Sequence, residues 1–400
     1  MSDELAFEGL KVLDMSQGVA APYCGMLLAQ NGADVIKVEP PVPGDWSRAM
    51  GKPYDDQSAA SVILNRGKRS IAINFKKPNG VAITKELARG ADVVLQNYRP
   101  GVIEKFGLDY ASIAKDNPSV VYLSLTGFGQ TGPKAKHPAT DSVMQAFTGF
   151  MSINRNEDGT PQRIDYYAID VITGLYAFQA VSSALYRRAM KGTGKHIQTS
   201  LLESALAFQE AKMVEFKLEG GPGEPIGSPV GTFRTTDGFI CVNARRDPHF
   251  QALCRLLGRE ELIDDPRYAD ARSRVANRHD LLAIVAEAMA TKSKAEWAAA
   301  LNAVDILNAP VNDYANLFEE PQVAAVGAVR WIEHDTVGHV PMGAIAGIPP
   351  MATENPRSHS PHIGEHSREI LAALGKSEAE VAALFADGTV SEIDQPRTVE

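Results

Sequence analysis

The first 130 residues alternate short apolar runs with helical stretches, and this alternation constrains the fold more than any other feature of the chain. Such an alternation predicts an α/β fold, a Rossmann-like parallel sheet with helices on both faces. The predicted strands span 10–16, 33–41, 70–76, 91–98 and 120–128. The predicted helices include 22–32 and 78–90. Ligands of such sheets bind beyond the carboxyl ends of the strands, so a site is expected in the loops that follow them.

A long helix is predicted over 170–190, because small residues from Gly174 to Ala184 share one face and permit close helix packing. A short strand and a helix over 204–220 follow it. The Gly- and Pro-rich stretch 219–229 is typical of a linker, and 233–244 of a hairpin with Asp-Gly at its turn. The sequence thus predicts a large domain over 1–218, completed by about 330–400, and a smaller α+β domain over 230–305, with linkers at 219–229 and 305–330.

Charge and composition exclude several classes of protein. The net charge is -9 and no run of Lys or Arg occurs, which argues against nucleic acid as a partner. No apolar run of about 18 residues is present, and the acidic start MSDELAFEGL lacks the apolar core of a signal peptide, so no membrane association is expected. The three cysteines have no metal or redox spacing, which favours a reducing compartment and a cytoplasmic location.

Common cofactor and catalytic motifs are missing from the sequence. The segment after the first strand, SQGVAAPYCG, holds only Gly18 and Gly25, where a dinucleotide site needs three spaced glycines. No Walker lysine loop and no G-x-S-x-G is found, so neither a nucleotide hydrolase nor a serine hydrolase is predicted. His359, His362 and His366 cluster in RSHSPHIGEHSRE, which we interpret as a solvated loop rather than a metal site. No metal site is therefore predicted.

Two further features allow both a structural and a functional interpretation. Basic residues stand at the ends of several predicted strands, where they either cradle a phosphorylated ligand or form ordinary charged loops. Asp170 opens the long helix, where its plain role is to cap the helix amino terminus. The amides of that helix end would also orient a reactive carboxylate and stabilise negative charge.

Five segments in order resemble the family III CoA-transferases, also called the CaiB/BaiF family, which includes formyl-CoA transferase-like enzymes. The resemblance runs from about residue 8 to 205 and more faintly to about 385. The segments that carry it are LKVLDMSQGVAAPYCGMLLAQNGADVIKVEPPVPGD, LNRGKRSIAIN, VLQNYRPGVIEKFGLDY, GFGQTGP and DVITGLYA with GTGKHIQTSLLESA.

This resemblance implies an acyl-CoA:carboxylate CoA-transferase with Asp170 as its nucleophile. A carboxylate at this position attacks the acyl-CoA thioester to give a mixed anhydride, and the CoA thiolate returns to give an aspartyl-CoA thioester. Covalent catalysis of this kind divides one difficult exchange into easier steps. Coenzyme A and acyl-CoA are then substrates, a small carboxylic acid is the partner substrate, and no tightly bound cofactor is expected.

The resemblance also implies CoA contacts and an assembly. By position, the CoA contacts carry over to Val19, Ala20, Asn74, Lys76, Asn97, Tyr98, Arg99, Lys105, Lys136 and His137. Asp141 matches an acidic residue near the transferase site, and Arg245 and Arg246 are candidates for binding a substrate carboxylate. Family members form dimers of interlocked rings, so a homodimer is expected here.

Two departures from related enzymes narrow the function. Formyl-CoA:oxalate transferases carry a glycine-rich loop where this chain reads CVNARRDPHF, and an arginine where it has Pro40, which disfavours oxalate. The α-methylacyl-CoA racemases share the fold and use a His thirty positions before the Asp, where this chain has Thr140. Without that second base, proton transfer at an α-carbon is hard to perform. A racemase-type isomerase and a non-catalytic acyl-CoA-binding protein remain the alternatives.

Overall fold

The computed structural model describes residues 5–156, 158–349 and 356–393. The chain divides into two compact units, residues 1–210 with 327–400 and residues 211–326. The predicted domain limits at 218, 230 and 305 stay predictions. The larger unit contains a central sheet whose strands are β1 (Lys11–Asp14), β2 (Asp34–Glu39), β3 (Arg69–Ile73), β4 (Val93–Gln96), β5 (Val121–Thr126), β6 (Lys195–Ser200) and β12 (Val390–Ser391).

The order of the seven strands is β12-β3-β2-β1-β4-β5-β6. Six strands pair in parallel, and β12 pairs antiparallel with β3 through Val390 and Ile73. The five predicted strands of the first 130 residues are therefore confirmed as neighbours in one parallel sheet. The chain winds outward from β1 in one direction and then from β4 in the other. The crevice between the carboxyl ends of β1 and β4 is the position where doubly wound sheets bind ligands.

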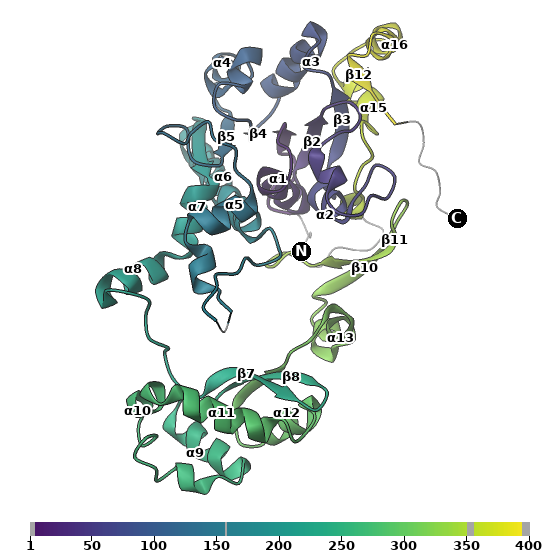
Figure 1. Cartoon of the computed structure of the whole chain (residues 1–400). Coiled ribbons are helices and arrows are strands. Elements are labelled where there is room, and N and C mark those ends of the chain that lie inside the picture. The colour runs from purple at the N-terminus through teal and green to yellow at the C-terminus, as the bar shows by residue number, and fades with distance from the viewer. Residues whose placement is uncertain (1–4, 157, 350–355, 394–400) are drawn as a thin grey trace. The chain divides into compact units, whose positions relative to one another are not determined.

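Helices cover both faces of this sheet (Figure 1). The helices of the larger unit are α1 (Ala20–Gln30), α2 (Ala59–Asn65), α3 (Pro78–Arg89), α4 (Tyr110–Asp116), α5 (Asp141–Phe147), α6 (Ala168–Lys191), α7 (Leu201–Phe208), α15 (Ser367–Ala373) and α16 (Glu378–Ala386), with α8 (Glu210–Glu219) leading into the smaller unit. Alternate strand residues face opposite ways, so Val12 packs with α1 and α6 while Leu13 packs with α3 and α15. Two buried cores result, one on each face.

The long helix α6 packs directly against α1. A Cβ atom at Gly174 would lie 2.7 Å from the Ala20 carbonyl oxygen, so only glycine permits this approach. Ala177 and Ala184 are also buried, which confirms the predicted small-residue face. By length and composition α6 would suffice to cross a membrane, but here it is a core helix of the larger unit.

The smaller unit has a three-stranded sheet and its own core. The strands β7 (Val230–Thr235), β8 (Gly238–Asn243) and β9 (Leu307–Pro310) pair antiparallel in the order β7-β8-β9. The predicted hairpin over 233–244 is thus confirmed. The helices are α9 (Asp247–Leu256), α10 (Ala271–Ala276), α11 (Arg278–Met289), α12 (Lys294–Asn302), α13 (Tyr314–Phe318) and α14 (Pro321–Ala325). The buried Trp297 joins this core and donates its indole N–H to the Met289 carbonyl.

Two predictions of secondary structure are wrong. The helix predicted over 204–220 is split into α7 and α8 at Gln209, whose buried side chain donates to the Thr148 carbonyl. The segment 305–330, predicted to be a linker, contains β9, α13 and α14. Strand β9 is found only through its pairing with β8, a long-range contact that local sequence does not reveal.

The end of the chain returns to the larger unit, where β10 (Val329–His334) and β11 (Gly338–Gly343) form a separate hairpin. In Figure 1 the yellow helices α15 and α16 lie beside the purple strands of the central sheet. The interpretation of the histidine-rich stretch as a solvated loop is wrong for His362, which is buried. Its Nδ1 lies 2.6 Å from Asp56 Oδ1, and its Nε2 lies 3.2 Å from Asp335 Oδ2.

These two carboxylates determine the protonation of His362. Burial alone would lower the pKa of His362, but the hydrogen bond and charge of Asp56, with the charge of Asp335, raise it to about 9. The protonated ring therefore joins the C-terminal segment to the loop before α2. Because the folded-state pKa lies above the unfolded value near 6.5, this stabilisation is fully present below pH 6.5 and is lost as the pH rises through about 9.

We expect His362→Gln to lower the free energy of unfolding by about 3 kcal/mol at pH 6 and by much less at pH 10. Urea unfolding of wild type and variant at both pH values measures this difference. His339→Gln is the matched control, since the exposed His339 pairs with an exposed Glu333 and its loss should cost under about 0.5 kcal/mol. An equal loss for His362→Gln at pH 6 and pH 10 would contradict the ionic explanation.

Candidate active site

A cavity of about 340 Å³ opens at the carboxyl ends of the strands, at the point where the strand order reverses. Loops after β1, β4, β5 and β6 contribute to it, together with the first turn of α6. Its lining residues are Gln17, Val19, Ala20, Trp46, Asn97, Tyr98, Arg99, Pro100, Leu125, Thr126, Gly127, Ala135, His137, Ala139, Thr140, Asp170 and Leu201. Among these, Asp170 is the one carboxylate, and Arg99 is a cation that forms no ion pair within the described residues.

The loops after β1 and β4 are clamped together by Gln17 and Asn97. The Gln17 backbone N–H donates to Asn97 Oδ1 at 2.9 Å, and Asn97 Nδ2 donates to the Gln17 carbonyl at 2.6 Å. The adjacent Gly18 has a φ of +80°, and a Cβ atom there would lie 1.8 Å from the Trp46 ring. Only glycine therefore allows Trp46 to lie over this loop. The clamp and the glycine fix the two walls of the cavity that meet at the crevice.

Asp170 lies in the first turn of α6 as its third residue, so the prediction that it is the N-cap is wrong. Tyr167 stands at the N-cap and makes no capping bond with its side chain. Asp141 of α5 caps the helix instead: its Oδ2 accepts from the backbone N–H of Ile169 at 2.7 Å and from that of Asp170 at 3.1 Å. The Asp170 carboxyl is thereby left free to face the cavity.

The environment of Asp170 changes its acidity. Burial, followed by the nearby charge of Asp141, raises the pKa of Asp170 to about 7. About half of the carboxyl groups are therefore ionised near neutral pH. A carboxylate of raised pKa is a stronger nucleophile than an ordinary one and is still available at pH 7, which is the compromise that a reactive carboxylate requires.

The structure brings together six of the ten predicted CoA contacts. Val19, Ala20, Asn97, Tyr98, Arg99 and His137 line the same cavity as Asp170. Lys136 lies between the lining residues Ala135 and His137 but does not line the cavity itself. The assignment of these residues to CoA stays a prediction. Asn97 already uses its side-chain amide in the clamp to Gln17, so its free capacity for a ligand is limited.

Asn74, Lys76 and Lys105 lie outside the cavity. The loops that carry them meet nonetheless, because Phe75 packs against Phe106 with ring centroids 5.5 Å apart. The two lysines flank this aromatic pair in sequence and belong to loops at the carboxyl ends of β3 and β4. Arg245 and Arg246 belong to the smaller unit, directly before α9, and their role in binding substrate stays a prediction.

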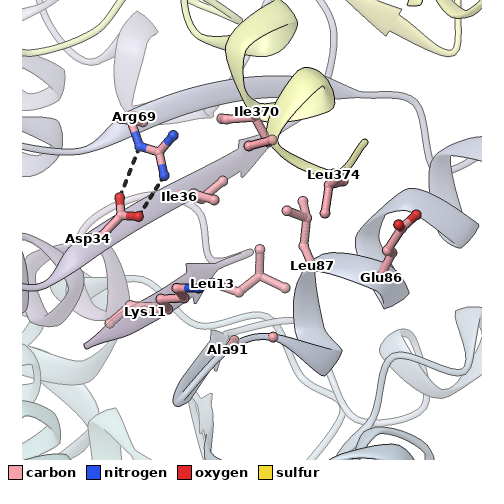
Figure 2. Close-up of a pocket in the computed structure, with 13 residues that line it drawn as sticks. Lys11, Leu13, Asp34, Ile36, Arg69, Glu86, Leu87, Ala91, Ile370 and Leu374 are labelled. Atoms are coloured by element: carbon pink, nitrogen blue, oxygen red, sulfur yellow. Dashed lines mark hydrogen bonds and ion pairs between the residues drawn. The ribbon is translucent and has the colours of Figure 1, made fainter. Parts of the chain in front are cut away.

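A second cavity of about 240 Å³ lies at the opposite, amino ends of β1, β2 and β3 (Figure 2). Its floor and walls are apolar, with Leu13 and Ile36 from the sheet facing Leu87 and Leu374 from the helices. The Arg69 guanidinium at its rim is paired with Asp34. Its two carboxylates are both paired, Asp34 with Arg69 and Glu86 with Lys376, so the site beside Asp170 is the better candidate for catalysis.

Comparison with known proteins assigns the family. A sequence model described as CoA-transferase family III matches residues 7–367. The chain belongs to CoA-transferase family III. It is 35% identical over 382 residues to a succinate--glutarate CoA-transferase of Agrobacterium fabrum, covering 92% of this chain and 95% of that protein. It is 36% identical over 326 residues to an acetyl-CoA:oxalate CoA-transferase of Acetobacter aceti, covering 80% and 84%.

The fold is also similar to that of a solved member. A crystal structure of a CAIB/BAIF family protein from Brucella suis superposes with a TM-score of 0.83 at 34% sequence identity, covering 93% of this chain and all of that one. The resemblance inferred from the five sequence segments is thereby confirmed. In this family III chain the residue thirty positions before Asp170 is Thr140, which lines the cavity but has no side chain that can act as a base near neutral pH.

Several residues of the site were not predicted from the sequence. Gln17 follows the first predicted strand directly, so the rule for strand ends would have found it. Trp46 enters the cavity from a short 3-10 helix after β2 whose path the sequence does not give, and Thr126 is the last residue of β5. Gln145, which contacts Asp141, lies in a short helix that was not predicted.

We expect the Asp170 carboxyl to titrate with a midpoint near pH 7. Carbon NMR of protein labelled at aspartate Cγ measures this, with the signal assigned by its absence in Asp170→Asn. Asp141→Asn removes the neighbouring charge and should move the midpoint to lower pH. Asp165→Asn, an exposed carboxylate of the preceding segment, should leave it unchanged. An unshifted midpoint in Asp141→Asn would show that Asp141 is not a cause of the raised pKa.

Proposed function

We propose that this protein transfers coenzyme A from an acyl-CoA donor to a small carboxylic acid, with Asp170 as the covalent nucleophile. One observation carries the proposal: a single carboxylate of raised pKa faces a cavity at the crevice of a family III chain. Membership of the family supports CoA transfer as the reaction, and the position of Asp170 in the cavity supports this residue as the nucleophile. The isomerase alternative is disfavoured because no second base lies at position 140.

The chemistry proceeds through two covalent forms of Asp170. An oxygen of its carboxylate attacks the acyl carbonyl carbon, and the C–S bond breaks to give an acyl-aspartyl anhydride and CoA thiolate. The thiolate attacks the Asp170 carbonyl carbon, which releases the donor acid and leaves an aspartyl-CoA thioester. The acceptor carboxylate attacks this thioester to form a new anhydride and thiolate. The thiolate then takes the acceptor acyl group and regenerates the Asp170 carboxylate.

Each intermediate needs groups that stabilise charge and exclude water. The thiolate and the oxyanions that form beside Asp170 lie near Arg99, His137 and the backbone around Gly127, all of which line the cavity. The apolar wall of Leu125, Ala139 and Leu201 reduces the access of water to the anhydride. Retention of the thioester energy depends on this, because water would hydrolyse either intermediate.

We further propose that the acceptor is a small dicarboxylic acid. The relatives above are named for succinate with glutarate and for acetyl-CoA with oxalate, and each name contains at least one dicarboxylic acid. The unpaired Arg99 supports the proposal, since a guanidinium can bind the carboxylate that does not react. Pro40 and the missing glycine-rich loop favour acids longer than oxalate.

A homodimer is a separate proposal, made by resemblance to the family. Helix α8 has no buried residue, yet it carries Met213, Val214, Phe216 and Leu218, whose side chains are exposed. A helix with apolar residues and no buried face commonly meets a partner. A second copy of this chain is the occupant that we propose.

The covalent intermediate is tested by intact-mass measurement after mixing the protein with a panel of acyl-CoAs. Wild type should gain the mass of CoA or of the acyl group, and Asp170→Asn should gain neither. Turnover should fall at least about a thousandfold in Asp170→Asn, while affinity for acyl-CoA changes little. A wild type that binds acyl-CoA tightly but forms no adduct with any donor would favour the non-catalytic alternative.

The acid panel tests the substrate class. We expect acceptors of four and five carbons with two carboxylates to give the highest kcat/KM, and the corresponding monocarboxylic acids to lose at least about tenfold. Arg99→Lys should reduce this preference, because Lys cannot make the bidentate contact. Equal rates for monocarboxylic and dicarboxylic acids would exclude a specific role for a second carboxylate.

The assembly is tested by sedimentation at micromolar concentration. A homodimer has twice the chain mass of 43.1 kDa. Phe216→Ser combined with Leu218→Ser should weaken it, whereas Lys217→Ser on the same helix should not. A wild type that sediments at 43.1 kDa at all concentrations tested would contradict the proposal.

A further inference from the structure

Gln145 is a buried amide that no part of the mechanism above uses directly. It lies on α5, one helical turn after Asp141, and its side chain is fully buried. Its Nε2 donates to Asp141 Oδ1 at 2.6 Å and to the carbonyls of Ile164 and Tyr166 at 3.1 Å each. Its Oε1 accepts from the Ile164 backbone N–H at 2.9 Å. One side chain thus joins α5 to the segment that leads into α6.

The orientation of this amide is fixed by its partners. A backbone N–H can only donate, so the Ile164 N–H requires the oxygen of Gln145 on that side. The NH₂ group must then face the Asp141 carboxylate and the two carbonyls, which can only accept. No other uncharged amide side chain of this length both accepts from the Ile164 N–H and donates to the Asp141 carboxylate. A glutamate would place a second carboxylate against Asp141, and a methionine would remove every one of these bonds.

The contacts continue from Gln145 to Asp170 through Asp141. Gln145 holds one oxygen of the Asp141 carboxylate, and the other oxygen holds the backbone N–H groups of Ile169 and Asp170. Asp141 is therefore held at both carboxylate oxygens while it caps α6, and its charge acts on the Asp170 carboxyl. A change of about 1 Å in the placement of a reactive group can reduce a rate about a hundredfold, so this bracing bears on catalysis.

We propose that Gln145 is a positioning residue, which acts through Asp141 to hold the first turn of α6 and the Asp170 nucleophile in their reactive placement. The proposal rests on the transferase function of Asp170 and adds a residue to it. Gln145 also joins the 164–166 segment to the same carboxylate, so the entrance to α6 and the nucleophile are held as one unit.

Other titratable side chains lie near the first turn of α6 or line the same cavity as Asp170. Tyr167 belongs to the turn before it, and Tyr23 of α1 lies near Tyr167. Tyr98, Arg99 and His137 line the cavity from other loops. None of these five side chains bonds to the backbone of the first turn of α6 within the described residues. Loss of Gln145 should therefore alter the placement and the titration of Asp170 while the cavity lining stays in place.

The test compares Gln145→Met with Gln30→Met. Gln30 is the matched control because its buried Nε2 also joins two backbone carbonyls, those of Arg66 and Arg357, away from the cavity. With Gln145→Met we expect the rate of adduct formation to fall at least about tenfold, acyl-CoA affinity to change less than about twofold, and the Asp170 titration midpoint to move at least about one pH unit downward. Gln30→Met should alter stability but none of these three quantities.

A double-mutant cycle then tests whether Gln145 acts through Asp141. If it does, Asp141→Asn with Gln145→Met should form adduct within about twofold of the rate of Asp141→Asn alone. The proposal would be overturned if the two substitutions reduced the rate of adduct formation by factors that multiply in the double variant. It would also be overturned if Gln145→Met behaved like Gln30→Met. If Gln145→Met does not fold, Gln145→Asn replaces it with the same expected outcomes, since the shorter amide cannot reach Asp141 and the 164–166 segment together. If wild type forms no adduct, the transferase function fails, and the titration midpoint alone still decides the role of Gln145.

Discussion

The site depends on two ion pairs that are buried beneath its first loop. Lys37 pairs with Asp45 at 2.6 Å and Lys68 with Asp14 at 2.8 Å, and all four side chains are buried. Asp45 Oδ1 also accepts from the Gly18 N–H, so this network positions the loop between β1 and α1 from below. Loss of one partner would leave a buried charge unpaired, at a cost of about 3–5 kcal/mol. The loop can therefore bring its backbone to the cavity edge without support from a ligand.

The topology of the sheet explains why the functional residues meet. Strands β1 and β4 are neighbours although many residues separate them, and the loops after them diverge to opposite sides. The divergence leaves a crevice, which Gln17 and Asn97 bridge. Asp170 enters from α6, whose packing on α1 requires Gly174. The nucleophile and the first loop are thus both anchored on the packed pair of helices α1 and α6.

The predictable and the unpredictable parts of this structure differ in the range of the contacts that decide them. The five strands of the first 130 residues and the long helix could be predicted, because their apolar patterns are local. Strand β9, the break at Gln209 and the burial of His362 could not, since each depends on a partner far away in the chain. In the site, resemblance supplied Asp170, but the cap at its helix comes from Asp141 and Gln145 across space.

Asp170 lies at a helix amino terminus, which lowers the pKa of a carboxyl group, although a carboxylate nucleophile benefits from a raised pKa. A helix amino terminus stabilises a carboxylate, which would lower its pKa and weaken it as a nucleophile. Here Asp141 takes up the free N–H groups of Ile169 and Asp170, so the helix end satisfies a different carboxylate. Asp170 gains the nearby negative charge instead, and with burial its pKa rises to about 7. Because Asp141 caps the helix, the helix end no longer lowers the pKa of Asp170. Asp170 is therefore a more reactive nucleophile than a carboxylate that accepts from the helix N–H groups itself.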